Sequence, residues 1–279
     1  MIHRRSVLAL LASAGFCAHA FAEVAPQRSE IRDSLSKRFV DDGTSGTFVA
    51  YDVDDYFIVA SDRVRSGEAL LPASTFKIAN SLIALETGVV DDPDKDVFKW
   101  DGTNYPLKEW NRDHTLRSAI AASVVPVYQE IARRIGTERM QKYVDLLQYG
   151  NRDISGGIDQ FWLKGGLRID PMQQVDFVDR LRRGVLSISA RSQNLVRDIM
   201  PTMKADDAVI RAKTGLVTVD DPAAPGGSRP VIGWLVGWTE KGPQKKQTVF
   251  ALNMDIREPR HVASRMTIAR QLLADVGAI

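Results

Sequence analysis

The chain of 279 residues is 44% apolar and 26% charged, the composition of an ordinary globular protein. Its 37 lysines and arginines stand against 35 aspartates and glutamates, and this balance argues against a nucleic-acid or anionic-membrane partner. The length suits either one large domain or two small ones.

The first 22 residues have the pattern of a secretory signal. Arg4 and Arg5 form a positive segment, residues 7–16 are largely apolar, and Ala20-Phe21-Ala22 offers a small-x-small cleavage site. The apolar run is much shorter than the ~20 residues that span a bilayer. We expect cleavage before Glu23, export to the periplasm by the general or the twin-arginine route, and a mature domain over residues 23–279 without a membrane partner.

Cleavage would remove two arginines and the single cysteine, Cys17. The mature chain would then be near neutral and free of disulfides, resting on a hydrophobic core that a chain of this length can build. Only two histidines, His114 and His261, would remain, and they are isolated in the sequence. We therefore expect no metal site.

Helix and strand patterns alternate in the first part of the chain. Ile31, Leu35 and Phe39 recur at helical spacing and predict a helix over residues 27–40. Residues 47–53 and 56–60 are β-prone runs joined around two aspartates, which predicts a hairpin. An apolar helix is predicted over residues 75–86.

The middle of the chain is predicted to be helical and the last third to be mainly β. Helices are predicted over residues 116–122, 127–135, 138–147, 172–182, 191–199 and 263–274, and strands over 209–213, 231–239 and 248–256. Residues 151–170 predict a long surface loop, and Asp220–Pro230 a turn-like connection. Strands at both ends predict an α+β fold: an antiparallel sheet from both termini flanked by helices, with an inserted all-helical lobe.

The first chemical motif is Ser74-Thr75-Phe76-Lys77. A serine and a lysine three residues apart share one face of a helix, and an uncharged lysine can accept the serine proton. Ser34 and Lys37 have the same spacing, but on a polar helix face. Ser74 instead begins an apolar helix, where the backbone N–H groups favour developing negative charge. A plain N-cap serine is the alternative.

Three further motifs follow in order. Ser123-Val124-Val125 lies between two predicted helices, Tyr149-Gly150-Asn151 begins the glycine-rich loop, and Lys213-Thr214-Gly215 ends a β run ahead of Leu216. Each has a purely structural alternative: a helix cap, a packed aromatic and a bend. Together with the Ser74 motif they resemble the penicillin-recognising serine enzymes, whose signatures are S-x-x-K and K-T-G. The resemblance spans nearly the whole mature chain and implies the β-lactamase/DD-peptidase-like fold.

Within that superfamily the motifs resemble the class D, or oxacillinase, branch. Relatives with a glutamate base carry an E-x-x-x-N type motif in the loop, whereas residues 156–163 contain no glutamate here. Ser-x-Val and Tyr-Gly-Asn are the class D forms of the middle motifs. The resemblance implies a serine β-lactamase that opens the ring of penicillin-type antibiotics, its small-molecule substrates, and so confers resistance.

The resemblance also implies the catalytic groups. Ser74 would be the nucleophile, and Lys77, carboxylated by carbon dioxide or bicarbonate, the general base; no separate cofactor and no metal are implied. Desolvation would lower the pKa of the Lys77 ammonium, and the indole N–H of Trp162 would donate to the carbamate. The residues that the resemblance places around Lys77 are Phe76, Val125, Trp162 and Leu163.

The remaining roles concern the substrate. The backbone N–H groups of Ser74 and Leu216 would form the oxyanion hole. Ser123, backed by Lys213, would pass a proton to the departing ring nitrogen. The substrate carboxylate would be held beside Gly215 by Thr214 and Arg265, since arginine suits a planar anion. Alternatives to Arg265 are Arg257, Arg260 and Arg270.

Three questions stay open. The Asp220–Pro230 connection is longer than in many relatives and bears on which bulky β-lactams fit, carbapenems included. A monomer and a weak homodimer are both compatible with the sequence. A cell-wall transpeptidase or carboxypeptidase, or a β-lactam sensor domain, would share Ser74, Lys77 and Lys213, but Trp162 in its Phe-Trp-Leu setting favours the hydrolase.

Overall fold

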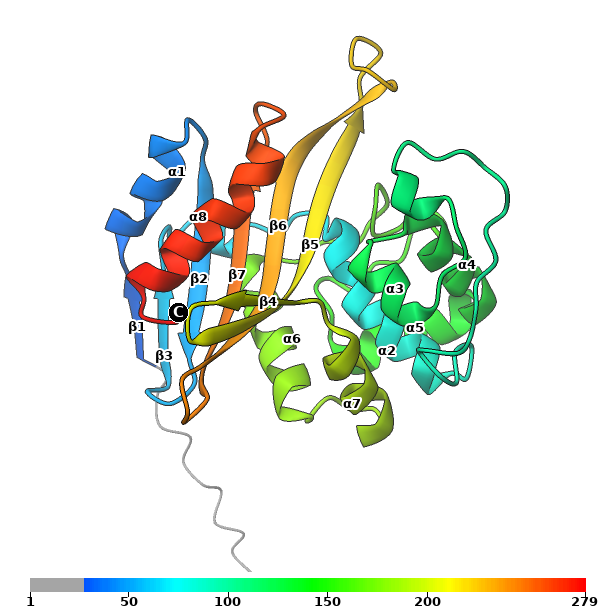
Figure 1. Ribbon diagram of the computed structural model, residues 1–279, viewed down its shortest axis with the longest axis horizontal. Coiled ribbons are helices and arrows are strands. Elements are labelled where there is room, and N and C mark those ends of the chain that lie inside the picture. Colours follow the sequence, from blue (N-terminus) through cyan, green and yellow to red (C-terminus); the bar gives the residue numbers. More distant parts are fainter. Residues whose placement is uncertain (1–27) are drawn as a thin grey trace, which may run out of the picture.

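A single seven-stranded sheet runs through the part of the chain that the computed structural model describes, residues 28–279 (Figure 1). The strand order is β1-β3-β2-β7-β6-β5-β4, and every pairing is antiparallel except β1 with β3. The strands are β1 (Arg28–Ile31), β2 (Gly46–Asp52), β3 (Phe57–Ala60), β4 (Thr202–Ala205), β5 (Ala208–Asp220), β6 (Ser228–Lys241) and β7 (Lys246–Asp255). The predicted leader and its cleavage site lie outside the described residues.

Helices cover both faces of the sheet and form a lobe beside it (Figure 1). The helices α1 and α8 lie on one face, and α2 to α5 belong to the lobe, which the chain enters after β3. The predicted α+β fold, with a sheet from both ends of the chain and an inserted helical lobe, is confirmed. The helices are α1 (Lys37–Asp41), α2 (Lys77–Glu86), α3 (Leu116–Ala121), α4 (Val125–Ile135), α5 (Thr137–Leu147), α6 (Pro171–Arg183), α7 (Ala190–Ile199) and α8 (His261–Asp275).

Two hydrophobic cores lie on opposite faces of the sheet. Successive side chains of a strand point to opposite faces, so Phe48 and Ala50 of β2 join the core under α8, while Val49 joins the core shared with the lobe. The same alternation runs along β7, where Phe250 and Ala251 face opposite cores. The sheet is therefore a common wall for both cores.

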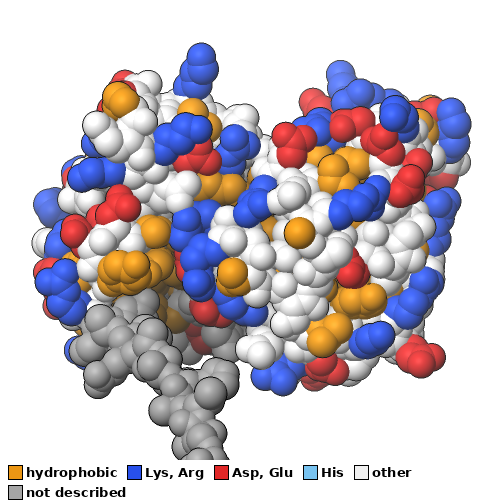
Figure 2. Space-filling model, turned by 90° about the horizontal axis from the view of Figure 1, so that it is seen from below, with side chains coloured by type: hydrophobic (Ala, Val, Ile, Leu, Met, Phe, Trp, Pro, Cys, Tyr) orange, Lys and Arg blue, Asp and Glu red, His pale blue; other side chains and the backbone are white. Residues whose placement is uncertain are grey.

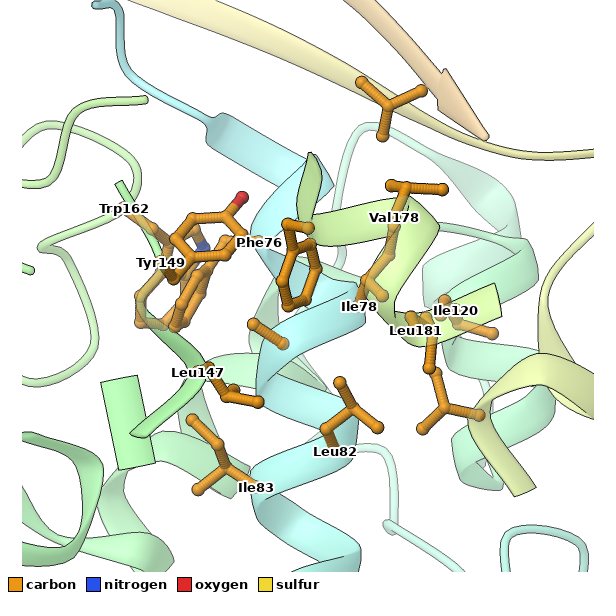
Figure 3. Close-up of a cluster of buried hydrophobic side chains, with 14 of the residues drawn as sticks. Phe76, Ile78, Leu82, Ile83, Ile120, Leu147, Tyr149, Trp162, Val178 and Leu181 are labelled. Carbon is orange, nitrogen blue, oxygen red and sulfur yellow. The ribbon is translucent and has the colours of Figure 1, made fainter. Parts of the chain in front are cut away.

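The helix α2 is the axis of the larger core. Figure 3 shows its side chains, among them Ile78, Leu82 and Ile83, pointing outward into apolar residues of the surrounding helices. Nine of its ten residues are buried, including Lys77. A polar side chain on so enclosed a helix requires a chemical or hydrogen-bonding reason.

Charged side chains of both signs are interspersed over the underside of the molecule (Figure 2). Among residues 28–279 no helix is long and apolar enough to cross a membrane. Within the same range, no group of three or more histidine, cysteine or acidic side chains is arranged to hold a metal ion.

One predicted element near the start of the chain is wrong, and one edge strand was missed. Residues 28–31 form β1, paired in parallel with β3, and only residues 33–41 are helical. The helical spacing of apolar residues is real, but tertiary pairing with β3 overrides it. The short strand β4, at the far edge of the sheet, was not predicted at all.

The second correction concerns β5 and its connection to β6. The strand does not end at Lys213-Thr214-Gly215 but continues to Asp220, and β6 starts at Ser228. Residues 221–227 alone form the connection, because Asp220 still pairs with Ser228. The result is a hairpin that projects beyond the rest of the sheet (Figure 1).

The third correction concerns the loop of residues 151–170. It contains turns but neither helix nor strand, as predicted, yet it is more than a surface loop. Phe161, Trp162, Leu167 and Ile169 are fully buried in the larger core. Its inner side therefore supplies part of the core beneath Ser74.

Candidate active site

A cleft of about 550 Å³ opens between β5 and the helical lobe. Residues that lie far apart in the sequence meet in it. Eight of the predicted site residues line it: Ser74, Ser123, Val125, Leu163, Thr214, Gly215, Leu216 and Arg265. Three others, Lys77, Trp162 and Lys213, are buried next to these residues, with at most 1% of their surface exposed.

Ser74 lies in a tight turn that leads directly into α2. The turn is a 3₁₀ helix over Ala73–Phe76, and Ala73 has a left-handed φ of +48°. Such a conformation costs on the order of 1–2 kcal/mol for a residue with a Cβ, so the surroundings must hold it in place. The side-chain Nζ of Lys77 lies 2.7 Å from Ser74 Oγ. A hydroxyl and a buried amine are thus in hydrogen-bonding contact, the arrangement that a nucleophile and its base require.

Lys77 is fully buried beside an aromatic ring. Burial lowers the pKa of Lys77 well below its ordinary value, and the nearby charge of Lys213 lowers the pKa further. The Tyr128 ring lies 5.3 Å from Nζ. No carboxylate lowers the cost of burying a charge on Lys77 among the residues described, so burial favours its uncharged amine.

Trp162 packs against the motif that carries the nucleophile. Its ring is stacked on Phe76 with the ring centroids 5.5 Å apart, and Figure 3 shows both side chains beside α2. The indole Nε1 is buried and has no hydrogen-bond partner within residues 28–279. A buried donor of this kind calls for an acceptor that the unmodified side chains do not supply.

Ser123 and Lys213 form a second polar pair on the other side of Ser74. Ser123 has a φ of +55° in the short link between α3 and α4, which turns its hydroxyl into the cleft. Lys213 Nζ donates to Ser123 Oγ at 3.0 Å and to the Thr214 carbonyl at 3.0 Å. Burial, followed by the charge of Arg265, lowers the pKa of Lys213 to about 7. A lysine with this pKa can exchange a proton near neutral pH.

The β5 edge forms one wall of the cleft. Only residues 208–211 of β5 pair with β4, so beyond them β5 has a strand neighbour on the β6 side alone. Gly215 allows close approach to the nucleophile turn, since a Cβ there would lie 3.0 Å from the Pro72 carbonyl oxygen. This brings Leu216 and Ser74 into the lining of the same cleft.

Arg265 enters the cleft from α8. It is 8% exposed, and its Nη1 donates to the Gly215 carbonyl at 2.7 Å. The Arg265 side chain passes beside Gly233, where a Cβ would lie 3.2 Å from Arg265 Cδ. Burial lowers the pKa of Arg265 to about 10, so it stays positively charged at neutral pH. An anion bound here would meet a partly dehydrated guanidinium.

The chain is similar to β-lactamases over most of its length. The family described as the penicillin binding protein transpeptidase domain matches residues 46–274. β-Lactamase OXA-10 of Pseudomonas aeruginosa is 41% identical over 246 residues, which are 88% of this chain and 90% of that protein. β-Lactamase OXA-48 of Klebsiella pneumoniae is 42% identical over 240 residues, 86% of each chain.

A solved structure shows the same fold. FUS-1 (OXA-85), a class D β-lactamase from Fusobacterium nucleatum subsp. polymorphum, is 36% identical and superposes with a TM-score of 0.81, covering 90% of this chain and all of that one. The chain belongs to the class D β-lactamases. The fold and the family predicted from the sequence motifs are therefore confirmed.

Within this class D β-lactamase the three alternatives to Arg265 lie elsewhere. Arg257 donates to Ser45, Arg260 pairs with an aspartate near the end of α1, and Arg270 donates to the Lys204 carbonyl. None of the three lines the cleft. The position of Arg265 depends on the passage of α8 across the sheet, which no local sequence signal reveals.

Several residues that line the cleft of this class D β-lactamase were not predicted from the sequence. Trp110 and Leu107 come from a segment for which no element was predicted, and their apolar character between polar residues was the available signal. Other missed lining residues are Gln160, Lys164 and Thr218. Asp220 and Ser228 also line the cleft, and they belong to the connection that was expected to bear on which β-lactams fit. Tyr149, singled out as part of a motif, is fully buried and packs edge-on against Phe76 and Phe177.

Proposed function

We propose that this protein hydrolyses the β-lactam ring of penicillin-type antibiotics through an acyl-enzyme on Ser74, with N-carboxylated Lys77 as the general base. The relatives that it matches are named β-lactamases, which supports the hydrolysis of β-lactams. The observation that carries the finer proposal is the 2.7 Å contact between Lys77 Nζ and Ser74 Oγ in a buried pocket.

The pocket fits a carboxylated lysine. Burial lowers the pKa of Lys77 and so favours its uncharged amine, which can attack carbon dioxide whereas an ammonium cannot. The orphan indole N–H of Trp162 is a suitable donor for the carboxylate that results. When present, the carbamate supplies a base that accepts the Ser74 proton and later activates water.

The other side chains bind the substrate and move its protons. Ser74 Oγ attacks the ring carbonyl, and the backbone N–H groups of Ser74 and Leu216 stabilise the oxyanion. As the C–N bond breaks, Ser123 gives its proton to the ring nitrogen and recovers one from Lys213, 3.0 Å away. Arg265 and Thr214 hold the substrate carboxylate, and Val125 and Leu163 screen the Lys77 pocket from bulk water.

Periplasmic export, with a leader cleaved between Ala22 and Glu23, completes the proposal and would allow the protein to confer resistance. The leader pattern in the sequence supports it.

Turnover of a chromogenic cephalosporin tests this function against its alternatives. We expect many turnovers per enzyme, stimulated by added bicarbonate. A transpeptidase, a carboxypeptidase or a β-lactam sensor would give one stoichiometric burst, because none of them deacylates quickly. Intact-mass analysis with a slow substrate should place the acyl group on the Ser74 peptide and find no adduct in Ser74→Ala. An adduct on the Ser34 or Ser123 peptide would refute the assignment.

A further inference from the structure

The strained turn that carries Ser74 is held from two sides. Trp234 Nε1 donates to the Leu71 carbonyl at 2.9 Å, just before the turn. Within it, the backbone N–H of Ala73 donates to the Trp162 carbonyl at 3.0 Å. These bonds connect the turn to the sheet and to the loop of residues 151–170, but neither accounts for the Pro72 carbonyl.

Thr75 holds the Pro72 carbonyl. Both the backbone N–H and the hydroxyl of Thr75 donate to it, at 3.1 Å and 2.8 Å. The hydroxyl has a single proton, so any other polar neighbour of Thr75 Oγ1 must be a donor.

One such donor comes from α6, and the buried Tyr149 hydroxyl is a further polar neighbour of Thr75 and of this donor. Gln174 Nε2 lies 2.9 Å from Thr75 Oγ1, and both side chains are fully buried. The two hydrogen bonds therefore run in one direction: the Gln174 amide donates to the Thr75 hydroxyl, and that hydroxyl donates to the Pro72 carbonyl. In a dry environment such successive bonds polarise and strengthen one another. A capping box at Asp170 fixes the first turn of α6, which fixes the position of Gln174.

We propose that Gln174 is a positioning residue for the Ser74 nucleophile, acting through Thr75 on the strained turn. This inference rests on the proposed function, since it assigns Gln174 to acylation of Ser74. An apolar side chain of equal size would fill the space but could not donate to Thr75. A shift of about 1 Å at a reacting atom can cost on the order of a hundredfold in rate, so partial loosening of the turn should be visible in acylation.

Gln193 provides a matched control. It is also a buried glutamine, 1% exposed, but it lies on α7 and bonds only to backbone groups of the preceding loop, such as the Leu186 carbonyl at 3.1 Å. It does not line the cleft, and none of its hydrogen bonds is to the turn that carries Ser74. Gln193→Met should therefore lower the melting temperature without slowing acylation.

Single-turnover stopped-flow kinetics with a chromogenic cephalosporin tests the proposal. Gln174→Met and Thr75→Val should each slow acylation about tenfold while the substrate dissociation constant changes less than twofold. The double variant should be no slower than the slower single variant, because both changes interrupt one chain of bonds. The burst reports acylation alone, so the acylation rate can be measured even if the wild type does not turn over. A wild type that does not turn over would refute the proposed function but not this inference.

Three results would overturn the inference. They are normal acylation in Gln174→Met, rate losses that multiply in the double variant, and an equal loss of acylation rate in Gln193→Met. If Gln174→Met does not fold, Gln174→Glu provides a second test of the same hydrogen bond. Its neutral acid can still donate to Thr75 and its carboxylate cannot, so its acylation rate relative to wild type should fall as pH rises. A ratio that stays constant with pH would contradict the role.

Discussion

Arg265 is the cationic residue best placed to select substrates with a carboxylate. Its guanidinium is partly dehydrated and already oriented by the Gly215 carbonyl. A charge-assisted bidentate pair contributes about 1.5–3 kcal/mol, so Arg265→Ala should lower kcat/KM for carboxylate-bearing substrates by about ten- to a hundredfold. Thermal stability should change much less.

Arg260→Ala is the control for Arg265. The Arg260 side chain is 52% exposed and pairs with Asp42, far from the cleft lining. Its removal should leave kcat/KM within about twofold, since exposed ion pairs contribute little. A large loss of kcat/KM in Arg260→Ala or Arg257→Ala, with normal kinetics in Arg265→Ala, would show that Arg265 does not bind the substrate carboxylate.

The buried amine of Lys77 predicts a specific dependence on pH. Its pKa lies well below the ordinary lysine value, which favours the uncharged amine that carbon dioxide can carboxylate. Acid protonates it and releases carbon dioxide. Activity should therefore fall in acidic, degassed buffer and recover on return to neutral pH with bicarbonate. Activity that is full in degassed buffer and indifferent to bicarbonate would require another base.

Carbon-13 NMR detects carboxylation of Lys77 directly. With labelled bicarbonate, a carbamate signal should appear in the wild type and be absent from Lys77→Ala. Trp162→Phe keeps an aromatic ring beside Phe76 but removes the indole N–H, so it should weaken the signal and slow deacylation more than acylation. An unchanged carbamate signal in Trp162→Phe would show that the indole is not its donor.

At the scale of elements, the loop of residues 151–170 is clamped at its base. Asn151 Oδ1 accepts from the Arg168 backbone N–H, and Asn151 Nδ2 donates to the Gly166 carbonyl, both at 2.9 Å. Beside it, Gly150 has a φ of +54°, and a Cβ there would lie 2.0 Å from the Arg168 carbonyl oxygen. The Tyr-Gly-Asn motif therefore closes the loop that carries Trp162 and Leu163.

This geometry separates two costs of replacing a glycine. Gly88 also has a positive φ, +70°, but nothing lies within 4 Å of its would-be Cβ. Gly88→Ala should lower the free energy of unfolding by about 1 kcal/mol from backbone strain, and Gly150→Ala by a further 1–3 kcal/mol or so from the clash. Only Gly150→Ala should also slow deacylation. Equal losses in urea titrations of the two variants would contradict the clamp.

At the scale of the whole molecule, the sheet joins two cores into one folding unit. Leu82 on α2 and Leu272 on α8 are both fully buried, each in a different core. Replacing either by alanine should cost about 2–5 kcal/mol. Four of the five tryptophans belong to or pack against the larger core, so their fluorescence reports on that side alone.

Leu272→Ala tests the coupling. Because both cores share the sheet, its midpoint in denaturant should fall equally by tryptophan fluorescence and by far-UV circular dichroism. A fluorescence midpoint that stays at the wild-type value while the circular dichroism midpoint falls would show two independent units.

The sequence by itself determined the family and the class of fold, and it named most of the residues that meet in the cleft. Ser74 with Lys77, and Lys213 with Thr214 and Gly215, are short motifs whose members act on immediate neighbours, so their spacing carries information without a structure. Long periodic segments such as α2 and α6 were predictable for the same reason, because their apolar spacing is a local property.

The tertiary structure alone decided which distant groups meet. Residues 28–31 became a strand because β3 lies beside them, and β5 reached Asp220 because β6 offered partners along its length. Arg265 was separated from its rivals by the path of α8 across the sheet, and Gln174 met Thr75 across 99 positions of sequence. Contacts of this kind depend on the packing of whole elements against one another, and a local pattern of residue types does not encode them.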